Sequence, residues 1–166
     1  MKLAIMVDVQ NGFISERTKH VIPKIEELLK SDFFDVVFAT KFINAQGSSF
    51  RKYLSWDKMS NKEEQEIPSL LIPYITKVFE KTTYTALNNE IKEFLNNNNI
   101  EEVYIFGIDT DCCVLKTAAD LFDNDYRPLV LLEYSSSNGG IESHNAAEIV
   151  LRRLIGTDQI IRGSIK

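Results

Sequence analysis

Apolar residues along this chain occur partly in short continuous runs, and such runs are typical of parallel strands that are covered on both faces. They predict strands at residues 2–9, 35–40, 76–80, 102–106 and 129–132. A further apolar stretch at residues 159–162 predicts a strand at the edge of the sheet.

Between these runs the apolar residues follow a helical spacing. Helices are predicted at residues 21–30, 62–66, 89–96 and 145–155, and directly after Cys113. Alternating strands and helices predict a three-layer α/β/α fold with a parallel sheet of about six strands, in the Rossmann-like order 3-2-1-4-5-6. The helix after Cys113 carries apolar residues at i, i+1, i+4, i+7 and i+8, namely Val114, Leu115, Ala118, Leu121 and Phe122.

The segment 41–58 follows neither pattern. It is rich in aromatic residues, contains Gly47, and shows no clean period. We expect an ordered loop here, and loops of this length in compact domains are often functional.

Length and charge narrow the class of protein. With 166 residues and 44% hydrophobic content, residues 1–166 are predicted to form one domain. The net charge of −5 argues against a nucleic-acid partner. No apolar run approaches the ~20 residues that cross a bilayer, so no membrane partner is expected. We expect no signal peptide, and the adjacent Cys112 and Cys113 are poorly placed for a disulfide, which predicts a cytoplasmic location.

Three chemically active side chains follow predicted strands. Asp8 ends the first strand, Lys81 follows the third and Cys113 follows the fourth. Because sites in such sheets form beyond the carboxyl ends of strands, an acid, a cation and a thiol are predicted at one edge. At the start of a helix, unpaired N–H groups and the helix dipole favour a reactive thiolate. The alternative is that both cysteines are small buried apolar residues.

The sequence around these residues resembles that of the isochorismatase-like cysteine hydrolases, which include nicotinamidases and N-carbamoylsarcosine amidases. The similar stretches are residues 7–13, 79–86 and 107–114, together with the Ser-rich stretch 135–140 and His144. The resemblance implies that Asp8, Lys81 and Cys113 form a catalytic triad. The family places its nucleophile directly before the residue matching Val114, which selects Cys113 over Cys112.

The resemblance also implies a mechanism. The Cys113 thiolate would attack an amide carbonyl to give a thioester, with Asp8 moving the proton and Lys81 orienting Asp8. A cis peptide at Ile108–Asp109 would aim the N–H groups of Asp109 and Cys113 at the oxyanion. Homo-oligomerisation is expected from the family.

The metal-dependent members of this family differ from the chain at one point. Those relatives carry an Asp-x-His pair after the second strand, where this chain has Phe42 and Asn44. The sequence contains two histidines, His20 and His144, both far from that segment. We therefore expect no metal and no cofactor. His144 is expected to cap or pack near a helix start.

A small-molecule substrate is expected to bind between loops at the same edge of the sheet. Aromatic side chains clamp planar groups and an amide supplies a hydrogen bond. Alternatively, Phe42, Phe50 and Trp56 are core or subunit-interface residues. The predicted binding residues are Phe13, Phe42, Asn44, Trp56 and Tyr84.

The combined interpretation is a metal-independent cysteine hydrolase that cleaves a small amide or related C–N bond. One alternative is a nicotinamidase- or pyrazinamidase-type amidase that holds its substrate without metal. Another is a catalytically silent binding domain on the same fold. The intact set of Asp8, Lys81 and Cys113 argues against the silent domain.

Overall fold

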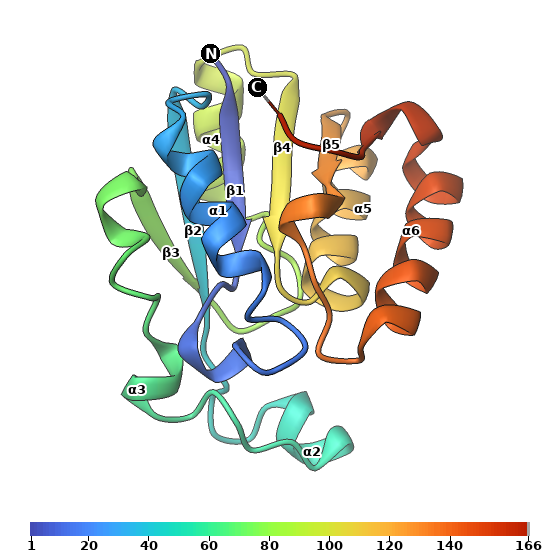
Figure 1. The fold of residues 1–166 in the computed structure, drawn as a ribbon. Coiled ribbons are helices and arrows are strands. Elements are labelled where there is room, and N and C mark those ends of the chain that lie inside the picture. The colour runs from blue at the N-terminus through green and yellow to red at the C-terminus, as the bar shows by residue number, and fades with distance from the viewer. Residues whose placement is uncertain (166) are drawn as a thin grey trace.

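A six-stranded parallel sheet forms the centre of the computed structural model, which describes residues 1–165 (Figure 1). Its strand order, β3-β2-β1-β4-β5-β6, confirms the prediction. The strands are β1 (Leu3–Val7), β2 (Val36–Phe42), β3 (Lys77–Lys81), β4 (Glu102–Gly107), β5 (Arg127–Leu131) and β6 (Ile160–Ile161).

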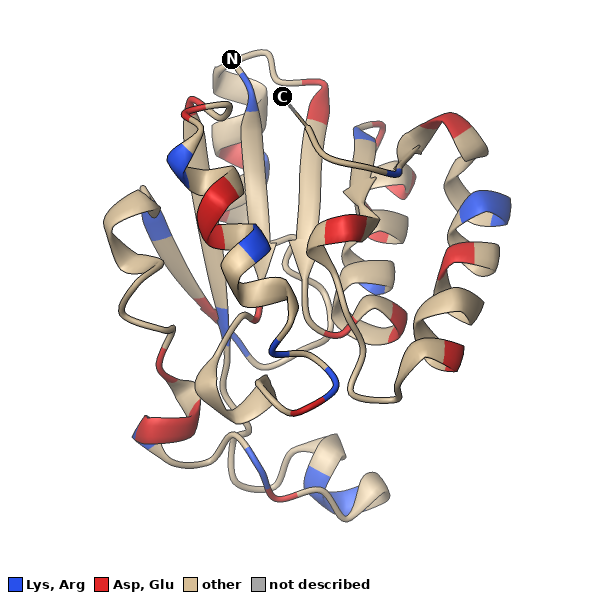
Figure 2. Cartoon of the chain, viewed as in Figure 1, with Lys and Arg blue, Asp and Glu red and all other residues tan. Residues whose placement is uncertain are grey.

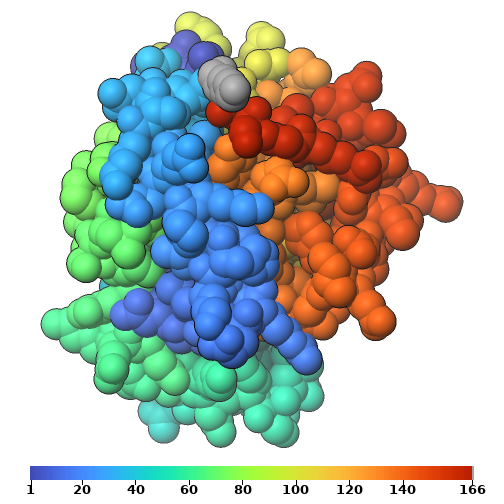
Figure 3. Space-filling view, viewed as in Figure 1, coloured from blue at the N-terminus to red at the C-terminus, as the bar shows by residue number. Residues whose placement is uncertain are grey.

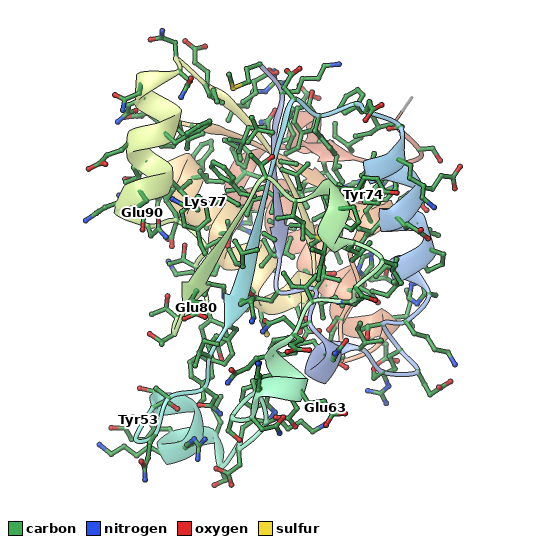
Figure 4. The ribbon with its side chains drawn as sticks, turned by 90° about the vertical axis from the view of Figure 1, so that its left-hand side faces the viewer. Tyr53, Glu63, Tyr74, Lys77, Glu80 and Glu90 are labelled. Atoms are coloured by element: carbon green, nitrogen blue, oxygen red, sulfur yellow. The ribbon has the colours of Figure 1, made fainter. Side chains whose placement is uncertain are left out.

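Helices cover both faces of the sheet and complete three layers (Figure 1). One face carries α1 (Val21–Lys30). The other carries α4 (Asn89–Asn97), α5 (Leu115–Asp123) and α6 (Ile141–Ile155). The short helices α2 (Ser49–Leu54) and α3 (Lys62–Gln65) lie beyond the carboxyl ends of the strands (Figures 1 and 4).

The central strands are apolar throughout because both of their faces are buried. Successive side chains of β1 point to opposite faces. Leu3 and Ile5 pack in the cluster that contains the inner sides of α4, α5 and α6, whereas Ala4 and Met6 pack with α1. All four side chains are fully buried, so β1 is fixed from both sides and its end is a rigid position for a site residue.

The segment 41–58 differs from the predicted loop. Strand β2 extends to Phe42, and α2 forms within the segment. The Ser48 side chain caps α2 by accepting a hydrogen bond from the Arg51 N–H, and Ser55 ends the helix in a left-handed conformation. Six residues are too few to show a helical period, so the pattern of apolar residues does not reveal α2.

Three further boundary differences bear on the site, and the first is that β1 ends at Val7, so Asp8 follows the strand instead of ending it. Helix α6 begins at Ile141, four residues before the predicted start at residue 145. Its first turn has no apolar periodicity, because Ile141 is largely exposed. Strand β3 ends at Lys81, which places the lysine inside the strand rather than after it.

Charged residues of both signs are interspersed around the fold (Figure 2). No helix within residues 1–165 is long and apolar enough to cross a membrane. In the space-filling view, residues 10–20 and the segment that carries α2 and α3 lie next to each other on one end of the molecule (Figure 3). Two hydrogen bonds link these segments: Asn11 donates to the carbonyl of Glu63 from its side chain and to the carbonyl of Glu66 from its backbone N–H.

Candidate active site

Asp8 directly follows β1, which lies between β2 and β4 in the sheet. Its backbone has a φ of 50°, a left-handed conformation that turns the chain sharply after the strand. The Asp8 N–H donates to Thr40 Oγ1 over 3.1 Å, and the Thr40 hydroxyl donates to Asp8 Oδ1 over 2.6 Å. These two bonds fix a fully buried carboxylate in one orientation.

Lys81 supplies the positive charge opposite this carboxylate. Its Nζ lies 2.6 Å from Asp8 Oδ2, and the two side chains are 7% and 0% exposed. The ammonium also donates to the carbonyls of Thr83 and Tyr84, over 2.8 and 3.1 Å. Its distance to Cys113 Sγ is 3.6 Å. The lysine therefore bridges the acid and the thiol.

Cys113 lies in η3 (Thr110–Val114), a π-helical turn that continues into α5. The N–H of Val114 donates to the Asp109 carbonyl over 3.1 Å, five residues back. The predicted start of a regular α-helix at this point is thus a π turn, a feature that is frequent at functional sites. The structure brings together all three side chains predicted for the triad.

The chain reaches this turn through Gly107, which has a φ of +135°. A Cβ atom at this position would lie 2.1 Å from the Val7 carbonyl oxygen. Only glycine allows such an approach, so Gly107 lets the end of β4 come close to the backbone of the neighbouring strand β1. One residue further along, the peptide bond Ile108–Asp109 is cis, as the family resemblance implied.

The charge state of the thiol differs from the sequence-based expectation. Burial, followed by the nearby Asp8 carboxylate, raises the pKa of Cys113 well above its usual range, and Lys81 opposes this only in part. Burial and the Asp8 carboxylate thus oppose the thiolate that the helix start favours. The proton of the thiol has the Asp8 carboxylate beside it as an acceptor.

A cavity of about 330 Å³ opens above the thiol. Phe13 and Trp56 stack on one wall, with ring centroids 5.9 Å apart and planes at 16°. Phe42 lies between this pair and Phe50, whose ring contacts Tyr84 with centroids 4.9 Å apart. Four of the five predicted binding residues line the cavity, namely Phe13, Phe42, Trp56 and Tyr84.

Asn44 is the predicted binding residue that does not line the cavity. Its buried amide donates to the carbonyls of Trp56 and Lys58, over 2.8 and 2.9 Å, and accepts from the Ser48 hydroxyl over 2.6 Å. Both donors are therefore used to fold the segment 44–58. The prediction that Asn44 donates to a substrate is wrong, because its position is structural.

Several residues that line the cavity were not predicted from the sequence. Two of them form one unit: Asn138 donates to Asp109 Oδ1 from its backbone N–H over 2.8 Å and from its side chain over 2.9 Å. The signal for Asn138 was its place in the Ser-rich stretch 135–140. The Asp109 carboxyl gave no signal of its own. The missed lining residues are Gly12, Phe50, Leu54, Lys58, Cys112, Asn138 and the Asp109 side chain.

Comparison with known proteins agrees with this geometry. Residues 2–152 match the family described as "Isochorismatase domain". The chain belongs to the isochorismatase family. It is 30% identical to "Isochorismatase family protein 1B" of Dictyostelium discoideum over 146 residues, which cover 87% of this chain and 60% of that protein. The chain thus spans 60% of the length of this relative.

Solved structures related to this isochorismatase-family chain share its fold. The pyrazinamidase/nicotinamidase of Streptococcus mutans superimposes with a TM-score of 0.84 at 20% identity, covering 97% of this chain and all of that one. The N-carbamoylsarcosine amidase of Thermoplasma acidophilum gives a TM-score of 0.72 at 22% identity, covering 91% of this chain and 93% of that one. At these identities the likeness establishes the fold.

The residues of this isochorismatase-family chain do not fit the metal site of its metal-dependent relatives. Phe42 offers no ligand atom, and both Asn44 donors and its oxygen are engaged within the segment 44–58. Among residues 1–165, no group of three or more His, Cys, Asp or Glu side chains is placed to hold an ion.

His144 lies in the first turn of α6, away from the thiol. Its Nδ1 is 2.8 Å from Thr110 Oγ1. Burial lowers the pKa of His144, which favours the neutral ring. The expectation that this histidine packs near a helix start is confirmed.

Proposed function

We propose that this protein is a metal-independent cysteine hydrolase that cleaves a small amide or a related C–N bond through a thioester. The observation that supports this most strongly is the contact of Lys81 Nζ with both Asp8 and Cys113 at the floor of an aromatic cavity, at 2.6 and 3.6 Å. A nucleophile, a base and a cation that orients the base are the parts that covalent amide hydrolysis requires.

In the first step, Asp8 accepts the thiol proton as Cys113 Sγ attacks the carbonyl carbon. The C–N bond then breaks, and the nitrogen leaves as ammonia or an amine after taking this proton from Asp8. The product on the enzyme is a thioester. A neutral resting thiol suits this sequence because the proton moves only when the new bond forms, so no thiolate must be stabilised in a buried site.

Water completes the reaction. Asp8 takes a proton from the attacking water, and the same proton returns to sulfur when the thioester breaks and the acid departs. In both steps the negative charge on the carbonyl oxygen is held by the N–H groups of Asp109 and Cys113. The Asp109 N–H is suited to this role, because it donates to no acceptor among the described residues. Lys81 holds the Asp8 carboxylate in place through the buried ion pair.

A nicotinamidase- or pyrazinamidase-type substrate is the second candidate. The flat rings of Phe13, Trp56 and Tyr84 suit a planar aromatic amide, and the fold resembles that of the Streptococcus mutans enzyme. Such a ring would be held without a metal ion, since Phe42 and Asn44 provide no metal ligands.

The direct test is ammonia release from a panel of small amides that includes nicotinamide, with mass spectrometry of the quenched enzyme. We expect turnover that a chelator does not reduce, and an acyl adduct on Cys113. Cys113→Ala should lose both, whereas the matched variant Cys112→Ala should still form the adduct. Folded enzyme that binds small amides without releasing ammonia would instead identify a silent binding domain. Loss of turnover on chelation would contradict metal independence.

A further inference from the structure

The mechanism above uses only the backbone N–H of Asp109, yet the side chain of this residue also faces the cavity. Among the residues that line the cavity, two carry a charge: Lys58, which is exposed, and Asp109, which is half-buried. The charge of Lys58 is screened by solvent. The Asp109 carboxyl is therefore the main charged group available to a bound molecule.

One oxygen of this carboxyl is held by the protein and the other is not. Oδ1 accepts both hydrogen bonds from Asn138. Asn138 is itself fixed, because its Nδ2 donates to the Phe13 carbonyl over 3.0 Å and its Oδ1 accepts from the Ser15 hydroxyl over 2.8 Å. Among residues 1–165, no hydrogen bond reaches Asp109 Oδ2 and no basic side chain pairs with this carboxyl. The group is thus held rigidly with one acceptor left free.

The electrostatics of the site agree with a missing positive partner. Burial raises the pKa of Asp109 to about 6, the two Asn138 hydrogen bonds lower it in part, and the Asp111 and Asp8 carboxylates raise it further. Asp8 and Lys81 neutralise each other. The cavity consequently carries one uncompensated negative charge at neutral pH.

We propose that the Asp109 carboxylate selects amide substrates whose acyl part carries an ammonium group close to the scissile carbonyl. This inference rests on the proposed function. If the Asp109 N–H holds the carbonyl oxygen, the carboxylate of the same residue is close to groups two or three bonds from the carbonyl carbon. Charge-assisted hydrogen bonds are the strong ones, and aromatic walls that exclude water increase their effect. The faces of Trp56 and Tyr84 attract the same cation.

The test compares amides that differ only in an ammonium or a methyl group: glycinamide against propanamide, and 3-aminopropanamide against butanamide. At pH 7.5 we expect kcat/KM to favour the ammonium member of at least one pair by about tenfold or more, the scale of one hydrogen bond to a charged group. Asp109→Asn should reduce this ratio to about one or below. Asp111→Asn is the matched control, since its carboxylate accepts from the Ser137 hydroxyl over 2.5 Å and does not line the cavity. It should leave the ratio unchanged.

A binding measurement separates this inference from the proposed function. Calorimetric titration of the same amides into Cys113→Ala, with and without Asp109→Asn, reports the preference without turnover. Preference for the ammonium member that Asp109→Asn removes, in an enzyme that hydrolyses neither amide, would support the inference and contradict the proposed function. Equal hydrolysis of both members, or equal binding where nothing is hydrolysed, would overturn the inference. A ratio that survives Asp109→Asn would overturn it as well.

Discussion

The cavity has an inner wall and an outer wall that are built in different ways. The inner wall lies at the strand ends. Cys113 and Asp109 line it after β4, and behind Cys113 the Lys81 ammonium at the end of β3 pairs with Asp8, which follows β1. The outer wall is the segment 44–58, which contains one short helix and is held mainly by the buried amide of Asn44. The inner wall carries the proposed chemistry and the outer wall carries shape. Changes in the outer wall therefore alter which molecule binds without altering what is done to it.

Two glycines with positive φ provide the strongest test of this difference. Gly107→Ala in the inner wall would push a Cβ atom to 2.1 Å from Val7 O, a contact with backbone that cannot move, and we expect loss of the native fold. Gly47→Ala in the outer wall meets no atom within 4 Å and should cost only about 1 kcal/mol of left-handed backbone strain. Thermal unfolding of both variants measures the contrast. A stable Gly107→Ala protein would show that the two walls are equally adaptable.

The same difference explains what the sequence could predict. Strand ends were predictable, because apolar runs locate the strands and parallel order brings their carboxyl ends together. This places an acid, a cation and a thiol at one edge, whereas the choice of Cys113 over Cys112 came from the family resemblance. The different roles of Phe42 and Asn44 were not predictable, because no apolar period at this point separates a residue that faces the cavity from one that bonds the loop backbone.

Charge states were the second feature that sequence could not supply. The helix start near Cys113 suggested a thiolate, but burial and the Asp8 carboxylate outweigh the local effect of a helix end. Burial depends on residues far apart in the chain, so a local motif does not report it. The role of the Asp109 side chain was missed for the same reason, since its partner Asn138 is distant in sequence.

Asp8→Asn should separate reactivity from catalysis in the inner wall. Asparagine cannot move protons, so turnover should fall by about 10²-fold or more. Removing the negative charge, however, leaves Lys81 unopposed and lowers the pKa of Cys113, so iodoacetamide should alkylate the thiol faster at pH 7.5 than in the unchanged protein. Alkylation rates measured from pH 6 to 10 test this. Slower alkylation together with slower turnover would mean that Asp8 stabilises a thiolate, in conflict with the neutral resting thiol.

Trp56→Ala should act on binding alone. The ring stacks on Phe13 and lines the cavity, so its removal should lower kcat/KM by about tenfold, mainly through KM, since a lost aromatic contact is worth about 1 kcal/mol beyond its buried area. Tyr53→Ala is the matched control, because Tyr53 lies on the outer side of α2 and is 75% exposed (Figure 4). A fall in kcat with unchanged KM would show that the outer wall takes part in the chemical step.

His144→Ala is expected to have the smallest effect, and it tests whether a residue behind the inner wall influences the chemistry. Its ring hydrogen-bonds to Thr110, so turnover should stay within about twofold, and loss of the Thr110 contact should cost about 1 kcal/mol of stability.

The pKa of His144 is lower in the folded protein than in the unfolded chain, so the unfolded chain binds more protons as the pH falls. The contribution of this residue to stability is therefore present above pH 6.5 and is lost as the pH falls through the lowered value. The stability difference between the unchanged protein and His144→Ala should therefore shrink from pH 7.5 to pH 5. Urea unfolding at both pH values measures that difference, and the rate of Cys113 alkylation against pH provides the second readout. A raised pKa of the thiol in His144→Ala would instead assign the histidine to the nucleophile and remove the distinction between the inner wall and the helix behind it.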